Sequence, residues 1–565
     1  NLQMKCTTPH IVNSLPEEEG RTIMKFIGMK EEAREHRGIG GVDTSDSDGE
    51  EEGGGGGARN DSALKWDCLV LTAMNEKQKR IFEMQLEDVD WRRYAKKAVV
   101  LQDPPGVRAG SGGATVWLLT QNQEQHCFQP EDKVLLIHSG GLSQRTPHLS
   151  NVGKVFMTTP DDHTLILCKL KMLKSLVPAI NAGLFICASD VLERLPKTID
   201  KLENDVDFLL LMHRSPLEIA FNHGVYALGK EGLQLLRVLQ KPTEKKMRDI
   251  DAIQVTEGVE WAFTDSAYFM SMRMADKLIA FCGRHERKSE LCVYGDFLKP
   301  LGSFPDYIKS EPVNGDPETQ SMQENQMIWT LSLRACFSGS KVQLLDCGSD
   351  SFYHFGSIAE CRDNLYGNLR HHPIPVHSTW EYSVGYRSIV EYCSLPANNT
   401  TVGQRSIVSN CYVGDNRNGK KISIPDDVVV YSTPVIKDNV KGWVTVVIGA
   451  RDDVKKIYEK GEVEWTGVKI TDYEGLTLWD APVFMKASGA EDSLMSSLRK
   501  YKHRKTDPEV LTCCGWSMAD VVKYVDVDKL IEFRKQRRQL WWQYGPASLG
   551  EPSADDQPHL CMSDQ

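Results

Sequence analysis

The sequence lacks several patterns that would place it in a familiar class of protein. Its fifteen cysteines contain no C-x-x-C pair, so we expect neither a disulfide framework nor a structural zinc site, and the scattered thiols favour a reduced, cytoplasmic protein. No apolar run is long enough for a membrane helix, which argues against a membrane partner. A G-x-x-x-x-G-K-S/T loop is also missing, which argues against a P-loop kinase.

An excess of positive charge is missing as well. The 67 lysines and arginines are outnumbered by 78 aspartates and glutamates, which gives a net charge of −11. Nucleic acid is therefore not expected as the main partner, although one nucleotide in a locally basic cleft is compatible with this charge. The 565 residues are enough for two or three domains.

The composition changes along the chain. Residues 1–62 include the acidic stretch 43–52 and the glycine run 53–57, so we expect a disordered acidic and glycine-rich tail. Residues 63–365 alternate apolar runs with amphipathic stretches, which predicts one Rossmann-like α/β domain with a doubly wound sheet that is mixed but largely parallel. The best strand candidates are 66–72, 134–137, 183–188, 208–212, 223–228 and 261–269, and the best helix candidates are 75–86, 165–176 and 273–282.

From about residue 366 the helical spacing disappears. Short β-rich pieces follow with a loose six-residue rhythm, in which Val402 and Val408 stand one hexad apart. This texture predicts a parallel β-solenoid, similar to a left-handed β-helix, over residues 366–510, with an irregular β-sandwich as the alternative. Residues 511–565 are expected to form a C-terminal helix and tail; the helix is rich in Lys and Arg, and its basic side could dock on the α/β domain, on a second copy of the chain, or be solvated.

A buried strand that ends in glycine is the most informative motif. Residues 133–138 lead into Gly140 and Gly141, and Arg145 and Lys154 follow shortly after. Bare backbone N–H groups and two cations at a strand tip predict a polyphosphate site. A second glycine-rich turn, residues 110–115, precedes another apolar stretch, so the two loops are expected to hold the two halves of one substrate.

An ordered series of motifs resembles the GDP-L-fucose pyrophosphorylases, a family of sugar nucleotidyltransferases also called fucose-1-phosphate guanylyltransferases. The resemblance is good from Leu64 to Leu301, moderate from Gln343 to Cys361, and present only in outline in the rest of the C-terminal half. The matching segments are 66–78, 110–115, 137–145, 153–156, 188–190, 223–225, 240–242, 264–266, 294–298 and 352–356.

The resemblance implies that a sugar 1-phosphate attacks the α-phosphorus of a nucleoside triphosphate and releases pyrophosphate. For this family the substrates are GTP and L-fucose 1-phosphate, Mg²⁺ is the cofactor and GDP-L-fucose the product. Such a reaction needs positioning and charge neutralisation more than a nucleophile. Arg145 and Lys154 are assigned to the triphosphate and the transition state. The nucleotide is assigned to backbone and hydroxyl groups of Gly110, Ser111, Gly112, Gly113, Thr115, Gly140 and Gly141.

The metal and sugar residues follow from the same resemblance. Asp190 is the expected Mg²⁺ ligand, or else a cap for the next segment, and Asp296 is the expected second ligand. His354 stands where related transferases carry an Asp, and imidazole is a poorer Mg²⁺ partner, which leaves the second ligand open. The sugar phosphate is assigned to His223, Gly224, Lys241 and Asp265, each of which could also be structural.

Two other functions are compatible with the sequence. One is a pyrophosphorylase for another sugar 1-phosphate or another base, because few side chains read the base. The other is a nucleotide-sugar-binding regulatory protein without strong catalysis, against which the presence of Arg145, Lys154 and Asp190 speaks. A homo-oligomer formed through the C-terminal region is a further possibility.

Overall fold

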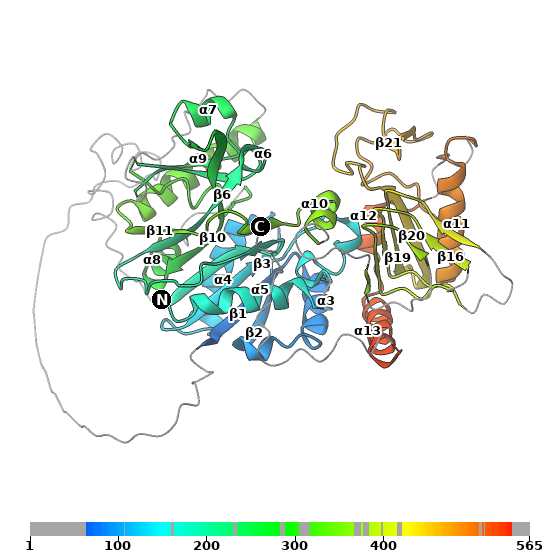
Figure 1. Ribbon diagram of the computed structural model, residues 1–565, viewed down its shortest axis with the longest axis horizontal. Helices are drawn as coiled ribbons and strands as arrows, with labels where there is room; N and C mark the ends of the chain where they lie inside the picture. The colour runs from blue at the N-terminus through cyan, green and yellow to red at the C-terminus, as the bar shows by residue number, and fades with distance from the viewer. Residues whose placement is uncertain are drawn as a thin grey trace, which may run out of the picture.

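The structure is a computed structural model in which a large α/β part lies beside a smaller β-rich part (Figure 1). The predicted disordered tail lies outside the described residues. The structure describes residues 64–106, 108–159, 163–229, 234–282, 289–303, 317–365, 374–376, 383–396, 399–414, 421–507, 511–512 and 515–544.

The α/β part is built on a ten-stranded sheet with the main order β11-β6-β10-β4-β3-β1-β2. Strands β2, β1, β3 and β4 are mutually parallel, and so are β11 and β6. The bounds are β1 Trp66–Ala73, β2 Ala95–Gln102, β3 Lys133–His138, β4 Gly183–Ala188, β6 Phe208–Pro216, β7 Gly224–Leu228, β8 Leu235–Gln240, β9 Ile253–Thr256, β10 Val259–Ser271 and β11 Val342–Asp346.

The sheet is mixed rather than largely parallel, because β10 is antiparallel to both β4 and β6. Strand β10 follows β9 through the two-residue turn Glu257-Gly258, in which both residues have positive φ (51° and 81°). Such a tight turn can only return the chain antiparallel. The predicted strands and helices of this part and the mixed sheet are confirmed; the expectation that the sheet is largely parallel is wrong.

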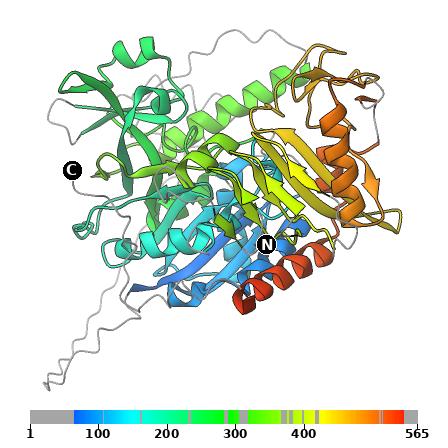
Figure 2. The same cartoon turned by 45° about the vertical axis from the view of Figure 1, so that its right-hand side comes forward.

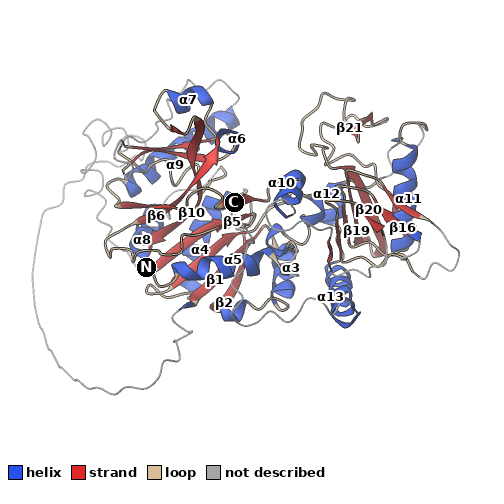
Figure 3. Ribbon diagram, viewed as in Figure 1, coloured by secondary structure: helices blue, strands red, loops and turns tan. Residues whose placement is uncertain are grey.

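Helices cover both faces of this sheet (Figure 3). Along β1, Leu69 and Leu71 belong to one hydrophobic cluster while Cys68 and Val70 belong to another. Helices α3 and α5 contribute side chains to the first cluster, and α4, α8 and α9 contribute to the second. The bounds are α3 Glu76–Leu86, α4 Gly110–Gln125, α5 Leu165–Leu173, α6 Leu217–Ala220, α7 Glu244–Arg248, α8 Met272–Cys282 and α9 Pro317–Phe337, with 3-10 turns at Trp91–Arg93, Pro147–Leu149, Lys154–Phe156 and Lys174–Leu176.

The β-rich part contains two ladders of short parallel strands. In the first, Ile389 pairs with Ile407, which pairs with Val429, so successive partners are 18 and then 22 residues apart. The same spacing holds from Val384 to Val402 to Ile424 in the second ladder. The bounds are β13 Ile374–Val376, β14 Ser383–Val384, β15 Ile389–Glu391, β16 Thr400–Val402, β17 Ile407–Ser409, β18 Ile422–Ile424 and β19 Val428–Lys437.

Beyond the ladders this part does not follow the sequence-based expectation. Strands β19 and β20 form a long antiparallel hairpin, and helix α11 packs on β20, so helical structure does not end near residue 366. A solenoid therefore stays a prediction for the ladders alone. The remaining bounds are β20 Val440–Gly449, β21 Glu464–Trp465, β22 Val468–Lys469, β23 Lys486–Ala487, α11 Ala490–His503, α12 Met518–Lys523 and α13 Val527–Tyr544.

Helix α13 packs against the α/β part of its own chain, as the turned view also shows (Figure 2). Arg80 of α3 pairs with Asp528 at 2.5 Å, and Lys535 pairs with Glu87 at 2.9 Å. Arg534 is buried, with its guanidinium 3.6 Å from the centre of the Tyr392 ring. Docking on the catalytic domain is thus confirmed for this helix, while association of two copies stays a prediction.

The two parts share one core. The hydrophobic cluster that contains β1, α3 and α5 continues through β15, β17, β19 and β20 to Leu530 and Ile531 of α13. Within the part of the chain that the structure describes, none of the helices is long and apolar enough to cross a membrane.

A buried ion pair inside this core gives a test of the fold. Lys169 of α5 contacts Glu193 of β5 (Val191–Glu193) with 2.6 Å between Nζ and Oε2, and both side chains are at most 1% exposed. Lys169→Ala leaves a buried carboxylate without a partner, so we expect a loss of about 3–5 kcal/mol in the free energy of unfolding. Urea denaturation followed by circular dichroism measures it.

The control is Lys245→Ala, which removes an exposed ion pair with Asp249 at 2.7 Å. We expect a change of about 0.5 kcal/mol or less, because exposed helical pairs contribute little. Equal losses in the two variants would contradict the assigned role of the buried pair.

Candidate active site

Hydrogen bonds hold the glycine loop after β3 against the end of β1. The hydroxyl of Thr72 accepts hydrogen bonds from the N–H groups of Ser139 and Gly140, at 3.0 and 3.3 Å. A Cβ on Gly140 would lie 3.1 Å from the backbone of residues 73 and 74, which explains the glycine by close approach. The backbone groups are therefore not bare, and this part of the prediction is wrong.

Gln78 of α3 adds hydrogen bonds to both loops. The sequence-based assignment of site residues did not include Gln78. Its Oε1 accepts hydrogen bonds from the N–H groups of Met74 (2.7 Å) and Gly141 (3.3 Å), and its Nε2 donates to the Gly141 carbonyl at 3.0 Å. The side chain is buried. A glutamine that bonds two strand-end loops at once fixes their separation. Its place in the first turn of a helix that follows a buried strand was the available signal.

The second glycine-rich segment is the first turn of helix α4, not a loop. Gly112 donates its N–H to the Leu291 carbonyl at 2.8 Å, and a Cβ on Gly110 would lie 2.3 Å from that oxygen. Thr115 hydrogen-bonds the Ser111 carbonyl and His138 Nε2, each at 3.0 Å. These groups serve packing in the structure, and Gly113 is buried beside them. Their nucleotide contacts stay a prediction.

Lys154 and Asp190 form the charged centre of the candidate site. The Lys154 ammonium lies 2.9 Å from Asp190 Oδ2 and donates a second hydrogen bond to the Gly356 carbonyl at 3.1 Å. Their side chains are only 12% and 21% exposed. Burial by itself would raise the pKa of Asp190, but the charges of Lys154 and His354 and the lysine hydrogen bond outweigh it, and the pKa falls well below its usual range. Asp190 is therefore an anion at neutral pH.

His354 of β12 (Phe352–His354) lies beside this pair. Its Nε2 is 3.7 Å from Asp190 Oδ2, and its Nδ1 is 2.9 Å from Glu360 Oε1. Glu360 also accepts a hydrogen bond from the Ser357 hydroxyl at 2.8 Å. A carboxylate on Nδ1 fixes the orientation of the ring and leaves Nε2 turned towards Asp190.

The candidate sugar-phosphate residues are partly assembled around the same place. The ring of His223 stands perpendicular to that of His354, with 4.9 Å between the centres, and its Nδ1 faces the Ile219 carbonyl at 2.8 Å. Burial lowers the pKa of His223, which favours the neutral ring. Lys241 donates its backbone N–H to the His223 carbonyl at 3.0 Å. Its backbone is in the left-handed region (φ 45°), and its side chain is exposed.

Asp265 and Gly224 form a buried pair. The carboxylate accepts a hydrogen bond from the Gly224 N–H at 2.9 Å through Oδ1, while Oδ2 has no partner in the described structure. A Cβ on Gly224 would lie 2.0 Å from Oδ2, so only glycine fits there. Burial raises the pKa of Asp265 to about 6.

Two predicted residues make no polar contact with Lys154 or Asp190 among the described residues. Asp296 accepts hydrogen bonds from the Cys292 N–H (2.7 Å) and from Gln326 Nε2 (3.2 Å), which gives it a local structural role. Arg145 is exposed and has no polar contact with other described residues, so it is available to an anion. Among the described residues no group of three or more His, Cys, Asp or Glu side chains is placed to hold a metal.

The chemistry of the donor set nevertheless suits Mg²⁺. This ion is usually held by one or two carboxylates together with phosphate oxygens, and Asp190 supplies one ionised carboxylate at a strand end. Asp296, turned to its own local partners, is not brought to Asp190 by any contact in the described residues. The second protein ligand therefore stays a prediction.

The fold and the site define an α/β protein with an acid–base pair at the strand ends that suits a phosphorylated ligand. A family model, the fucose pyrophosphorylase domain, matches residues 130–381 and 372–498. The chain belongs to this fucose pyrophosphorylase family.

Curated relatives agree with this assignment. The chain is 25% identical over 559 residues to the fucose-1-phosphate guanylyltransferases of Homo sapiens and Mus musculus, covering 83% of this chain and 90% and 92% of the relatives. It is also 25% identical over 440 residues to the bifunctional fucokinase/GDP-fucose pyrophosphorylase of Arabidopsis thaliana, covering 68% of this chain and 38% of that relative.

Gln78 acts as a clamp that holds the Met74 and Gly141 segments together, and truncation of its side chain tests this role. Gln78→Ala leaves the Met74 and Gly141 groups without their partner, so we expect a loss of about 2–3 kcal/mol in the free energy of unfolding. The matched control on the same helix is Gln85→Ala, which removes the single bond to the Val152 carbonyl (2.9 Å) and is expected to lose about 1 kcal/mol. Thermal and urea unfolding measure both, and a loss no larger than the control's would rule out the clamp.

Asp265 gives a prediction on pH. Its pKa rises from the usual 3.8 to about 6 on folding, so between these values the unfolded chain ionises first and stability falls as the pH rises. Asp265→Asn cannot ionise, and we expect its stability relative to the wild type to improve by about 2 kcal/mol from pH 4 to pH 7. Denaturation at both pH values measures the difference; a pH-independent difference would show that Asp265 is ionised normally.

Proposed function

We propose that the protein transfers GMP from GTP to L-fucose 1-phosphate, forming GDP-L-fucose and pyrophosphate. A phosphate oxygen of the sugar 1-phosphate attacks the α-phosphorus, the bond from that phosphorus to the bridging oxygen breaks, and pyrophosphate leaves with the bonding electrons. Family membership and the names of the curated relatives support the substrates. The partly buried Lys154–Asp190 pair near the strand ends is the structural observation that carries the proposal.

The charged centre suits a reaction between two anions. Lys154 would move from Asp190 to the triphosphate, where a point charge offsets the charge that develops on the leaving group. Arg145, exposed and unpaired among the described residues, would clamp phosphate oxygens in a bidentate fork. Mg²⁺, when bound, would be held by Asp190 and phosphate oxygens and would neutralise the triphosphate.

The sugar phosphate would lie on the side of His223 and Lys241. His223 is next to His354 and is kept neutral by burial, so its ring can exchange hydrogen bonds with sugar hydroxyls. The unpartnered Oδ2 of Asp265 is a second acceptor for a hydroxyl. A sugar phosphate is already ionised at neutral pH, so the proposed displacement requires no general base.

We also infer that the two parallel ladders are coils of a short β-solenoid, which the first step of each ladder supports because its 18 residues equal three hexads. A cytoplasmic location is proposed because the described cysteines form no disulfide.

The reaction is tested with purified protein, Mg²⁺ and L-fucose 1-phosphate, offering each nucleoside triphosphate separately and measuring pyrophosphate release. We expect release mainly with GTP, and a fall in kcat of about 100-fold or more in Lys154→Ala and Asp190→Ala. Lys245→Ala, an exposed lysine outside the site, is the control with unchanged activity.

Two results would redirect the proposal. Release with GTP and another sugar 1-phosphate, but not with L-fucose 1-phosphate, would make the protein a different pyrophosphorylase. Nucleotide binding without any release would favour a regulatory binding protein.

A further inference from the structure

The short helix α10 (Ile358–Asp363) lies between the α/β part and the β-rich part (Figure 1). It is fastened to His354 twice: Glu360 Oε1 is 2.9 Å from Nδ1 of the ring, and Asn364, just beyond the helix, donates to the His354 carbonyl at 2.6 Å. The Ser357 hydroxyl caps the helix by accepting the Glu360 N–H. Both the ring and the backbone of His354 are thus held from one short segment.

The turn between β12 and α10 contacts the charged centre directly. The Gly356 carbonyl accepts a hydrogen bond from Lys154, and the Phe355 N–H donates to the Asp190 carbonyl at 2.7 Å. A Cβ on Gly356 would lie 2.1 Å from the His354 ring, which leaves this turn little freedom. A shift of α10 would therefore move the partners of both Lys154 and Asp190.

On its other side α10 faces a stack of charged residues, which we call the arginine ladder: Arg387, Arg405 and Asp427. Each stands two residues before a paired position of the first parallel ladder, and each is in the left-handed region, with φ of 56°, 55° and 54°. The guanidinium of Arg405 holds Asp427 in a bidentate pair, with 2.8 Å from Nε to Oδ1. The repeat of the strands therefore places the three side chains one above another.

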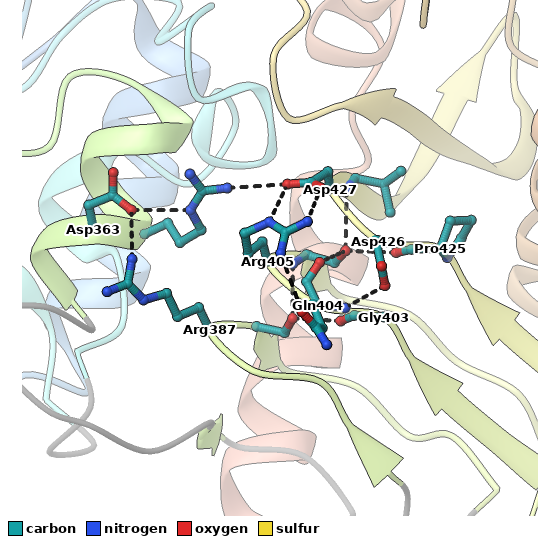
Figure 4. Close-up of polar contacts among 12 residues, drawn as sticks. Asp363, Arg387, Gly403, Gln404, Arg405, Pro425, Asp426 and Asp427 are labelled. Carbon is teal, nitrogen blue, oxygen red and sulfur yellow. Dashed lines mark hydrogen bonds and ion pairs between the residues drawn. The ribbon is translucent and has the colours of Figure 1, made fainter.

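Ion pairs join α10 to this ladder (Figure 4). Arg362 Nη1 lies 3.7 Å from Asp427 Oδ1, and Arg387 Nη1 lies 3.9 Å from Asp363 Oδ1. Arg362 and Asp363 also contact each other at 3.3 Å. A positive and a negative side chain of α10 thus each face the opposite charge on the β-rich part.

We propose that the arginine ladder positions the catalytic centre: it holds α10, and α10 holds His354 and the Gly356 carbonyl against Asp190 and Lys154. Glu360, Arg362 and Asp427 are positioning residues in this scheme. The ion pairs are partly exposed, with side-chain exposures between 16% and 54%, so each contributes little to stability. Their effect is on geometry, to which transfer between two bound phosphates is sensitive.

The test breaks the link at either side of the contact. Asp427→Asn removes the charge while keeping a residue type that tolerates positive φ, and Arg362→Gln removes the α10 partner while leaving the Arg405–Asp427 pair. The control is Glu260→Gln, which removes a similarly exposed bidentate pair with Arg248 (2.9 and 2.8 Å) away from α10. If Asp427→Asn does not fold, Arg362→Gln decides.

We expect kcat for pyrophosphate release to fall about tenfold in both test variants, with a smaller change in KM for GTP and no change in the control. Combining either with Glu360→Gln should produce little further loss, because all three act through His354. Additive losses, or kcat values equal to the control's, would contradict the proposal.

This readout rests on the proposed transfer reaction, so a second one is independent of it. In ¹⁵N-histidine NMR spectra the ring signals of His354, assigned with His354→Gln, should shift in Asp427→Asn and Arg362→Gln and stay in place in Glu260→Gln. Unshifted signals would overturn the positioning role even in an active enzyme. An inactive wild type with shifted signals would instead overturn the proposed function alone.

Discussion

The hydrophobic core shared by the two parts is the constraint on which the rest of the structure depends. Side chains from β1, α3 and α5 pack in one cluster with those of β17, β19 and α13. Two separate cores would leave the parts free to move against each other, as is usual where interfaces are small and polar. A shared core instead fixes α10 and α13 between them, and polar contacts across the boundary can then hold defined distances.

The strands were predictable where burial on both faces makes the sequence continuously apolar. Strand β4 has the predicted bounds, 183–188, because Leu184, Phe185 and Ile186 are all buried. The antiparallel direction of β10 against β4 and β6 was not predictable from its own residues, because the sequence of a strand does not show from which end of the sheet the chain enters it. Helix α11 was missed although Leu494 and Tyr501 are buried at helical spacing, because polar Ser493, Ser497 and Lys500 occupy much of the same buried face.

The candidate site likewise contains residues whose roles were predictable from the sequence and residues whose roles were not. Lys154 and Asp190 were identifiable because each follows a buried segment, and the ends of neighbouring strands meet at one edge. The role of the glycines was not, because it depends on distant partners: Thr72 for Gly140 and Leu291 for Gly112. A glycine sequence shows that the backbone comes close to something, and only the fold shows whether that is a ligand or another strand.

The pairing of Lys154 with Asp190 has a consequence for binding. An unpaired buried cation would be costly in the free protein, and so would an unpaired buried carboxylate. In the proposed reaction a triphosphate and its metal would give each charge a new partner, so neither charge would be left uncompensated. Such an exchange would require the two side chains to separate. The Gly356 carbonyl and the His354 ring, both held by α10, are placed to receive the same two groups as they part. The geometry of the Lys154–Asp190 pair therefore depends on the link between α10 and the β-rich part. This dependence explains why a helix of six residues carries so many polar contacts.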